Sequence, residues 1–497
     1  MCGLAGFIGF ENNNDLAAKA NKIQQHRGPD NQSVWQDDYI AFAHQRLSII
    51  DLSEAANQPF HKHDLVTVFN GEIYNYKELQ DKLIAEKQIT FNTSSDTEVV
   101  VEMFKHYGYD CLNHFLGMFA FAIYNRTTGE LFIARDHFGI KPLFYTQING
   151  AFAFSSELKT LVHVPGFNKT INPKSLVSCL NYIWISGNES MFKGCYKLPP
   201  AHYISYNKTT GLKLVKYWEL QDNTGNKTSS NIDSIAADVA DTMESSVKRH
   251  MVADVPVSCF LSGGLDSSLI SVLAKKSNDH LSTYTIGTDD KDKKAESMPD
   301  DEKYANMLAG LFNLDHNVIK ISPDILKDLP AMVKSLDEPI GDPAAINTYL
   351  ICKAARDKGV KVLLSGMGAD EIFFGYRRQK ATMMAQRFNR LPQPVKYVVS
   401  KMVNLLPVKI SNRGFKFGRW AKRFMSFATM PLERAYMRSY SYYDTDQLKE
   451  LLKADYWQGI EAINTEHKEI FDSKFKDDPF NRICNTDINM FMLGLNL

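Results

Sequence analysis

The sequence is poor in cysteine and in long apolar runs, and it carries no net charge. Its seven cysteines are scattered and never spaced as Cys-x-x-Cys, which excludes a disulfide framework and a structural zinc site and indicates a reducing compartment. No apolar run reaches the ~20 residues that span a bilayer. The amino terminus lacks the charged-then-apolar layout of a signal peptide. We therefore expect a soluble cytoplasmic protein without a membrane partner.

The charges balance overall but not locally. Lys and Arg together number 57, as do Asp and Glu, so the whole chain offers no electrostatic footprint for nucleic acid. Residues 377–423, however, contain no Asp or Glu and many Lys and Arg. This stretch predicts either a solvated face or a site for a phosphate-bearing or polyanionic substrate, such as a lipid- or nucleotide-linked sugar. Nucleic acid is not expected as a partner, because no aromatic interleaving or recognition motif accompanies the basic residues.

The chain is long enough for two to four domains, and its hydrophobic patterning changes once. The polar stretch from Gln221 to Asn231 is typical of a linker. Before it, alternating apolar residues around the turn at 126–129, and the Asn149-Gly150 pair between aromatic-rich segments, predict two β-hairpins.

After the linker the apolar period becomes helical. Residues 232–251 carry an apolar residue every three or four positions, which predicts an amphipathic helix capped by Ser230 or Asn231. Short apolar strands then alternate with helices at 255–261, 282–286 and 361–364, a pattern typical of a parallel sheet covered on both faces. From about residue 379 the chain reads as mostly helical.

Cys2 directly follows the initiator Met. Removal of the Met would leave Cys2 with a free α-amine that can take the thiol proton, although a small residue at position 2 is by itself often incidental. Five motifs stand in order along the first hundred residues: Met1-Cys2-Gly3, His26-Arg27-Gly28-Pro29-Asp30, Arg46-Leu47-Ser48-Ile49-Ile50-Asp51, Asn70-Gly71-Glu72-Ile73-Tyr74-Asn75 and Ser95-Asp96-Thr97-Glu98. Together they strongly resemble the class II glutamine amidotransferase domain over about 160 residues. The resemblance implies an amino-terminal-nucleophile hydrolase, an α+β β-sandwich with αββα layers.

The same resemblance assigns roles to individual residues. Cys2 would attack the glutamine side-chain amide, and Asn70 and Gly71 would form the oxyanion hole. Arg46 would grip the α-carboxylate and Asp96 the α-ammonium. The other implied glutamine-binding residues are Leu47, Glu72 and Asn75. Taken singly, Arg46 could be a strand residue, Asp96 a helix cap and Asn70-Gly71 a turn.

A glycine-rich segment links an expected strand to an expected helix. Ser262-Gly263-Gly264-Leu265-Asp266-Ser267-Ser268 follows the strand that ends at Leu261, a setting in which converging backbone N–H groups bind anions. The string resembles the loop of ATP pyrophosphatases, and residues 365–371 resemble that family's second segment. The implied ATP-binding residues are Leu261, Ser262, Gly263, Gly264, Asp266, Ser267, Ile286, Ser365 and Gly366. Asp266 and Asp370 would share Mg²⁺ with the ATP phosphates.

A glutaminase joined to an adenylating domain resembles the glutamine-hydrolysing asparagine synthetase family. The resemblance implies a glutaminase domain over 1–165, a connecting segment over 166–230, and an α/β parallel-sheet ATP-pyrophosphatase domain with a helical carboxy-terminal part over 231–497. It also implies asparagine synthesis: ATP activates the aspartate β-carboxylate, and ammonia from glutamine displaces AMP. The partners would be glutamine, ATP and aspartate or another small carboxylate, and a homodimer is compatible with the resemblance.

Two departures from the family keep alternatives open. Met367 stands where asparagine-forming members usually carry Glu, so the acceptor could be another carboxylate, such as a uronic acid in surface-polysaccharide biosynthesis. The family's last helical section is longer than residues 478–497. The chain is therefore expected to be either a fragment or a naturally short member. A third hypothesis is a non-catalytic relic that only binds nucleotide.

Overall fold

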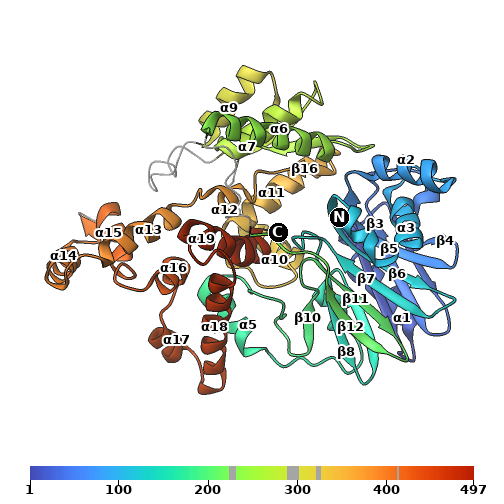
Figure 1. Cartoon of the computed structure of the whole chain (residues 1–497), viewed down its shortest axis with the longest axis horizontal. Helices are drawn as coiled ribbons and strands as arrows, with labels where there is room; N and C mark the ends of the chain where they lie inside the picture. Colours follow the sequence, from blue (N-terminus) through green and yellow to red (C-terminus); the bar gives the residue numbers. More distant parts are fainter. Residues whose placement is uncertain (223–230, 288–300, 321–325, 411–412, 497) are drawn as a thin grey trace.

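The chain forms two halves of different class, which a computed structural model describes over residues 1–222, 231–287, 301–320, 326–410 and 413–496 (Figure 1). Most of the expected linker, residues 223–230, lies outside the described residues. Figure 1 shows the strand-rich half, coloured blue to green, on the right, and the carboxy-terminal helices on the left.

The first half contains two six-stranded antiparallel sheets. The first sheet has the order β10-β8-β9-β1-β3-β2 and the second β12-β11-β7-β6-β5-β4. The strands of the first sheet are β1 (Gly3–Ile8), β2 (Asn31–Gln36), β3 (Ile40–Arg46), β8 (Phe144–Ile148), β9 (Ala151–Ser155) and β10 (Cys195–Lys197). Those of the second are β4 (Phe60–Lys62), β5 (Leu65–Ile73), β6 (Gly117–Asn125), β7 (Glu130–Arg135), β11 (His202–Asn207) and β12 (Gly211–Lys216).

Three apolar clusters stack these sheets between helices. One, including Phe42 and Val68, lies between the two sheets. A second joins the first sheet to α1 (Asn13–Ile23) and α4 (Leu158–Leu161). A third joins the second sheet to α2 (Tyr76–Lys87) and α3 (Asp96–Tyr107). This succession of helix, sheet, sheet and helix confirms the expected αββα sandwich.

Both expected hairpins form. β6 and β7 pair around the turn at 126–129, with Ile123 opposite Phe132. β8 and β9 meet at Asn149 and Gly150, whose φ angles are +51° and +86°. The positive φ at both central residues is what this short turn requires.

The segment 166–230 does more than connect the halves. It begins with α5 (Pro173–Tyr182), which packs against α18 (Trp457–Ser473) of the second half. It then adds β10 to the first sheet and β11 and β12 to the second. The sandwich therefore continues to Lys216, because sheet pairing recruits strands that follow α5.

The second half is built on a four-stranded parallel sheet of order β15-β14-β13-β16. Its strands are β13 (Val257–Phe260), β14 (Ser282–Gly287), β15 (Asp315–Lys320) and β16 (Val362–Leu364). The helices around it are α6 (Ile232–His250), α7 (Leu265–Lys275), α9 (Asp301–Phe312), α10 (Leu329–Ser335) and α11 (Ala344–Asp357). The sequence pattern does not predict β15, because only two of its six residues are apolar. Asn231 is the cap of α6, accepting a hydrogen bond from the Asp233 N–H at 3.0 Å.

Helices dominate the rest of the chain, as expected. They are α12 (Ala369–Phe373), α13 (Arg377–Asn389), α14 (Gln393–Leu405), α15 (Lys416–Met425), α16 (Leu432–Tyr440), α17 (Thr445–Leu451), α18, α19 (Pro479–Asp487) and a final π-helical stretch (Ile488–Asn496), with a short ribbon of β17 (Lys409–Ile410) and β18 (Arg413–Gly414) before α15. In the described part of the chain, no helix is both long and apolar enough to cross a membrane.

Candidate active site

Cys2 immediately precedes β1 and lies beside Leu47, the residue that follows β3. Its Sγ accepts a hydrogen bond from the Leu47 N–H at 3.4 Å and lies 3.6 Å from the Leu47 carbonyl oxygen. Arg27 Nε donates to the Cys2 carbonyl oxygen at 2.9 Å. Antiparallel pairing of β1 with β3 sets this arrangement, because Gly3 is opposite Gln45.

Asn70 and Gly71 lie on β5, in the neighbouring sheet. The Asn70 side chain is buried, and its Nδ2 finds no hydrogen-bond acceptor among the described residues. A Cβ at Gly71 would lie 2.2 Å from the Met118 carbonyl oxygen, so this position admits only glycine. A buried amide donor without a partner is costly unless a ligand completes it.

Arg46 and Asp96 are both buried near Cys2. The Arg46 guanidinium holds the 50–57 segment: Nη1 donates to the Ser53 carbonyl oxygen and to Asn57 Oδ1, both at 2.8 Å. Asp96 begins α3 and accepts from the Ile73 N–H at 3.0 Å. Burial raises the pKa of Asp96 to about 7. A neighbouring cation would bring that pKa back down, as expected of a site for an ammonium group.

A cavity of about 870 Å³ gathers these residues. The predicted glutaminase residues that line it are Cys2, Arg46, Leu47, Asn70, Gly71, Glu72 and Asp96. Asn75 is not among the lining residues: its Nδ2 donates to the His114 carbonyl oxygen and its Oδ1 accepts from the Leu116 N–H, each at 2.9 Å. Its amide therefore braces a neighbouring segment.

The same cavity reaches the second half of the chain. Its lining includes Phe260 of β13, Cys352 and Arg356 of α11, and Val362 and Leu363 of β16. The cysteine nucleophile candidate and the parallel sheet therefore share one cavity, whose lining does not include the predicted ATP-binding residues.

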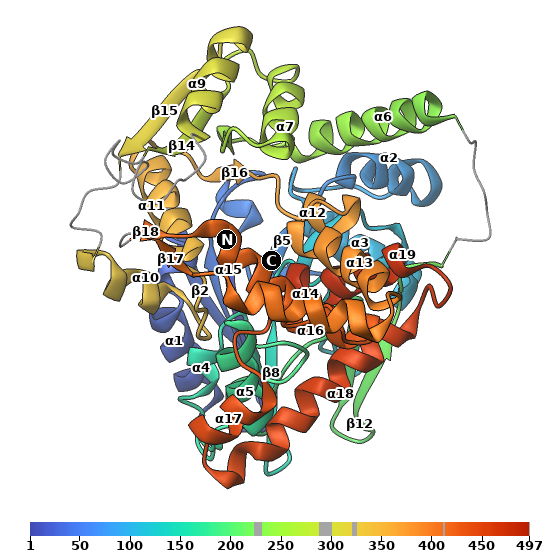
Figure 2. The ribbon, with the colours of Figure 1, turned by 90° about the vertical axis from the view of Figure 1, so that its left-hand side faces the viewer.

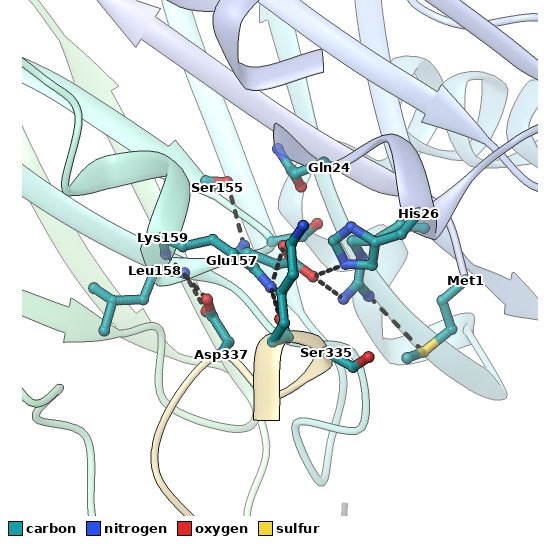
Figure 3. A network of polar contacts seen from close by, with 12 residues as sticks. Met1, Gln24, His26, Ser155, Glu157, Leu158, Lys159, Ser335 and Asp337 are labelled. Atoms are coloured by element: carbon teal, nitrogen blue, oxygen red, sulfur yellow. Dashed lines mark hydrogen bonds and ion pairs between the residues drawn. The ribbon is translucent and has the colours of Figure 1, made fainter. Parts of the chain in front are cut away.

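The buried Glu157 forms the centre of a polar network close to Cys2 (Figure 3). Its Oε1 accepts from Arg27 Nη1 at 3.1 Å and lies 2.8 Å from His26 Nε2, and its Oε2 lies 3.2 Å from Lys159 Nζ. Hydrogen bonds and these positive charges outweigh the burial and lower the pKa of Glu157. Because Arg27 also binds the Cys2 carbonyl, the network fixes the backbone at the nucleophile.

Two carboxylates of the second half, those of Asp337 and Glu338, bind residues of the first half. Asp337 accepts from the Leu158 N–H and, at 3.0 Å, from the Lys159 N–H, as Figure 3 shows. Glu338 accepts from the Met191 N–H at 3.0 Å and pairs with Lys197 at 2.8 Å. The carboxylates of the Asp337-Glu338-Pro339 loop thus anchor it to the sandwich.

The glycine-rich segment after β13 forms a tight turn into α7. Ser262 Oγ lies 2.9 Å from Ser267 Oγ, and the Ser262 N–H donates to Ser267 Oγ at 3.1 Å. Gly263 has a φ of +73°, and a Cβ there would lie 2.5 Å from the Asp301 carbonyl oxygen. Gly264 caps α7, so the backbone N–H groups of the first helical turn face the loop.

The second segment, residues 365–371, lies against this loop. A Cβ at Gly366 would be 2.9 Å from both Asp266 Cβ and Ser267 N. Burial raises the pKa of Asp266, and the negative charges of Asp370 and Glu371 add to this effect. Within the described ranges no group of three or more His, Cys, Asp or Glu side chains is placed to hold a metal alone. Two neighbouring carboxylates, of which Asp370 disfavours the charge of Asp266, nevertheless fit a shared Mg²⁺ completed by phosphate oxygens.

The remaining predicted ATP residues differ in what their side chains do. Leu261 is fully buried in an apolar cluster, and its N–H donates to the Tyr284 carbonyl oxygen at 2.8 Å, which leaves its backbone as the part near the loop. Ile286 is partly buried beside Tyr284 and Ile351. Ser365 Oγ accepts from the Met367 N–H at 3.5 Å.

Some residues of the 377–423 stretch have structural roles. Arg378 pairs with the buried Asp487 at 3.1 Å, and its guanidinium carbon lies 3.7 Å from the ring centroids of Tyr376 and Phe491. Arg423 donates to the Ser441 carbonyl oxygen at 2.8 Å. The stretch is therefore not uniformly a solvated face.

Sequence reasoning missed several residues around the cavity. Lys141 is buried near Glu72, and burial lowers its pKa. Lys361 pairs with Asp30 across the two halves at 2.6 Å. Nothing in the local pattern marks either lysine. Arg27 and Asp30 could have been found, because both belong to the His26–Asp30 motif.

Comparison with known proteins agrees with this geometry. Residues 1–218 match the glutamine amidotransferase domain family and residues 238–497 the asparagine synthase family. Glutamine-hydrolyzing asparagine synthetase 1 of Bacillus subtilis is 32% identical over 99% of this chain and 76% of its own length. A putative glutamine-hydrolyzing asparagine synthetase of Methanocaldococcus jannaschii is 32% identical over 82% of this chain and 81% of its own. Amidase chyE of Penicillium rubens is 29% identical, with 78% of this chain and 61% of the relative aligned.

Proposed function

Because the chain belongs to the glutamine-hydrolysing asparagine synthetase family, we propose that it moves ammonia from glutamine to a carboxylate that ATP has activated, with aspartate as the acceptor. The observation that carries the proposal is the cavity of about 870 Å³, whose lining joins Cys2 to β13, α11 and β16. A cavity that both halves share is what ammonia transfer between two sites requires, since bulk water would protonate the ammonia and hydrolyse an acyl adenylate.

In the glutaminase step, Cys2 is the nucleophile once Met1 is removed. The α-amine that this removal exposes on Cys2 can take the thiol proton, so that one residue supplies both nucleophile and base. The thiolate adds to the side-chain carbonyl carbon of glutamine, and the unpaired Asn70 Nδ2 and the Gly71 N–H stabilise the oxyanion. Ammonia leaves as the thioester forms, and water then releases glutamate.

The route toward the second half suits neutral ammonia. Ile49, Ile50, Phe260, Val362 and Leu363 give the cavity apolar walls. The positive charges of Arg356 and Lys361, which also line it, disfavour ammonium and leave ammonia unaffected.

In the synthetase step, the loop at 262–267 would cradle the ATP phosphates. Mg²⁺, held by Asp266 and Asp370, would neutralise phosphate charge as pyrophosphate leaves. The acceptor carboxylate attacks the α-phosphorus, and ammonia then displaces AMP from the acyl adenylate. The products of glutamine, water, ATP and the acceptor carboxylate are therefore glutamate, AMP, pyrophosphate and the new amide.

A second acceptor is favoured by Met367. Its side chain is 53% exposed between β16 and α12 and can neither accept a proton nor steer ammonium. A uronic acid or another small carboxylate is therefore the alternative substrate class.

Pyrophosphate release by the purified chain tests both. With glutamine and ATP present, release that depends on aspartate supports asparagine synthesis, and release that depends on a uronic acid supports the alternative. If no acceptor stimulates pyrophosphate release and glutamine is not hydrolysed, both acceptor proposals are contradicted. The hypothesis of a nucleotide-binding relic would then remain.

A further inference from the structure

Helix α14 has an apolar stripe on the outside of the molecule. Val395, Val398, Met402 and Leu405 recur at intervals of three, four and three residues, so they share one helix face. The exposed fraction rises along the stripe and reaches 63% at Met402 and 83% at Leu405. Lys396 is instead buried, with its Nζ 3.2 Å from the Asn389 carbonyl oxygen. This is the reverse of an ordinary surface helix, which turns its apolar stripe inward.

Helix α15 extends the apolar surface. Phe417 and Trp420 are one helical turn apart and 64% and 53% exposed. The Trp420 ring is flanked by cations, with Lys416 Nζ 5.1 Å and the Arg377 guanidinium carbon 5.6 Å from its centroid. α14 and α15 pack against each other and form the left-hand tip of the molecule in Figure 1, on the side that faces the viewer in Figure 2. We call the six apolar side chains on these two helices the α14–α15 tip.

The charged residues of the stretch that carries the tip have one sign. Residues 377–423 contain no Asp or Glu, and Arg387, Arg390, Lys401, Lys416 and Arg419 are exposed there. A second copy of the same face would bring like charges together. A polysaccharide or nucleic acid would pair with the cations but leave the exposed Val, Met and Leu side chains in water. A membrane surface with an apolar interior and negatively charged headgroups matches both the exposed apolar side chains and the cations.

We propose that the α14–α15 tip binds peripherally to a membrane surface that contains anionic lipid. α14 has 13 residues, too few to span a bilayer, and the exposed stripe suits a helix that lies in the plane of the headgroups. Trp420 and Phe417 would enter the boundary between headgroups and acyl chains, while the flanking Lys and Arg meet lipid phosphates. The proposal revises the expectation of no membrane partner and does not depend on the proposed catalytic function.

Co-sedimentation of the full chain with vesicles tests this. We expect binding to vesicles of phosphatidylcholine mixed with phosphatidylglycerol, weaker binding as sodium chloride is added, and little binding to phosphatidylcholine alone. Met402→Glu combined with Leu405→Glu should weaken partitioning by about tenfold or more, because it removes two apolar insertions. Leu311→Glu is the matched control, since Leu311 is 71% exposed on α9, outside the tip.

Charge reversal tests the electrostatic part. Lys401→Glu combined with Arg419→Glu should weaken binding by about tenfold at low salt, and the exposed Lys213→Glu on β12 should not. All variants replace exposed side chains, so thermal unfolding and glutamine hydrolysis should match the parent chain.

Three results would overturn the proposal. Equal binding to both vesicle types, or to neither, would contradict recognition of anionic lipid. Retention on heparin that Leu405→Glu leaves unchanged, without vesicle binding, would indicate a soluble polyanion. A concentration-dependent dimer lost in Leu405→Glu, again without vesicle binding, would indicate a second copy of the chain.

Discussion

The two candidate sites differ in how far the protein alone completes them. Around Cys2, the side chains of Arg46, Asn70 and Asp96 are at most 5% exposed and held by both sheets of the sandwich. Around the glycine-rich loop, Leu265 is 82% and Met367 53% exposed, and the charge of Asp370 helps to raise the pKa of Asp266.

The difference follows from the chemistry of the two ligands. Glutamine is small, so a pocket of buried donors and acceptors can be built before it arrives, which lowers the cost of reorganisation during the reaction. ATP with Mg²⁺ carries its own charges, and a loop of backbone N–H groups and two carboxylates becomes favourable only when those charges are present. We therefore expect substitutions at Cys2 and at the loop to separate the two activities.

The largest expected effect is at the nucleophile. Cys2→Ala should lower glutamine hydrolysis by at least about a thousandfold, because the thioester cannot form. Pyrophosphate release with added ammonium should persist, as the ATP site is untouched. Glutamate and pyrophosphate assays measure the two activities. Cys352→Ala is the matched control, since Cys352 lines the same cavity on α11, and glutamine use surviving in Cys2→Ala would refute the assignment.

Removal of the unpaired amide donor comes next. Asn70→Ala should lower kcat for glutamine hydrolysis by roughly 10²–10³-fold, equivalent to about 2.7–4 kcal/mol of oxyanion stabilisation, with little change in KM. Steady-state glutaminase kinetics check this. A rise in KM with kcat unchanged would instead mean that Asn70 only binds the ground state.

Asp96 should make glutamine capture depend on pH. Its pKa of about 7 means that the carboxylate becomes protonated as the pH falls through 7, and kcat/KM for glutamine should then fall by about tenfold per pH unit. Since this pKa is raised above its unfolded value, the same group makes folding less favourable as the pH rises from about 4 to 7. Asp96→Asn should abolish this limb of the kcat/KM profile, and an unchanged profile would contradict its role.

Backbone strain in the glycine-rich loop should impair the ATP-dependent activity and leave glutamine hydrolysis intact. Gly263→Ala forces a side chain into positive φ and against the Asp301 carbonyl, so ATP-dependent pyrophosphate release should fall by about tenfold and the free energy of unfolding by about 1–2 kcal/mol. Gly264 has a φ of −74°, so Gly264→Ala should cost less than about 1 kcal/mol in urea unfolding. Glutamine hydrolysis should be intact in both variants, and its loss would show that the halves are not separable.

The smallest effect is expected where the halves touch. Lys361→Ala removes the ion pair with Asp30, which is about 30% exposed on each side, and should change the free energy of unfolding by no more than about 1 kcal/mol. The ratio of glutamate to pyrophosphate formed should rise above one, because Lys361 also lines the shared cavity. A ratio that stays at one would show that this contact does not seal the passage.

Sequence reasoning predicted most of the fold. The strand hairpins and the parallel sheet follow from apolar periodicity, whereas the αββα layers were implied by the family resemblance. The in-order motifs named residues from Cys2 to Asp96 that line one cavity, and their roles stay predictions. Sequence reasoning missed β15, whose residues are mostly polar. It also assigned the strands β10 to β12 to a connection, although β10 pairs with β8 and β11 with β7, both much earlier in the chain.

The contacts that were not predicted span long sequence separations. Glu157 contacts His26 and Arg27, some 130 positions earlier, and Asp337 binds the main chain at Leu158. Lys141 owes its perturbed pKa to burial beside Glu72. None of these contacts has a local signature, because each forms only when segments distant in the sequence come together on folding.

Transfer of labelled nitrogen tests the central claim most directly. Glutamine labelled with ¹⁵N in its side-chain amide should be incubated with ATP, Mg²⁺, aspartate and excess unlabelled ammonium. The shared cavity predicts asparagine whose amide carries the isotopic enrichment of the glutamine. Asparagine with the enrichment of the bulk ammonium would contradict enclosed transfer between the two sites.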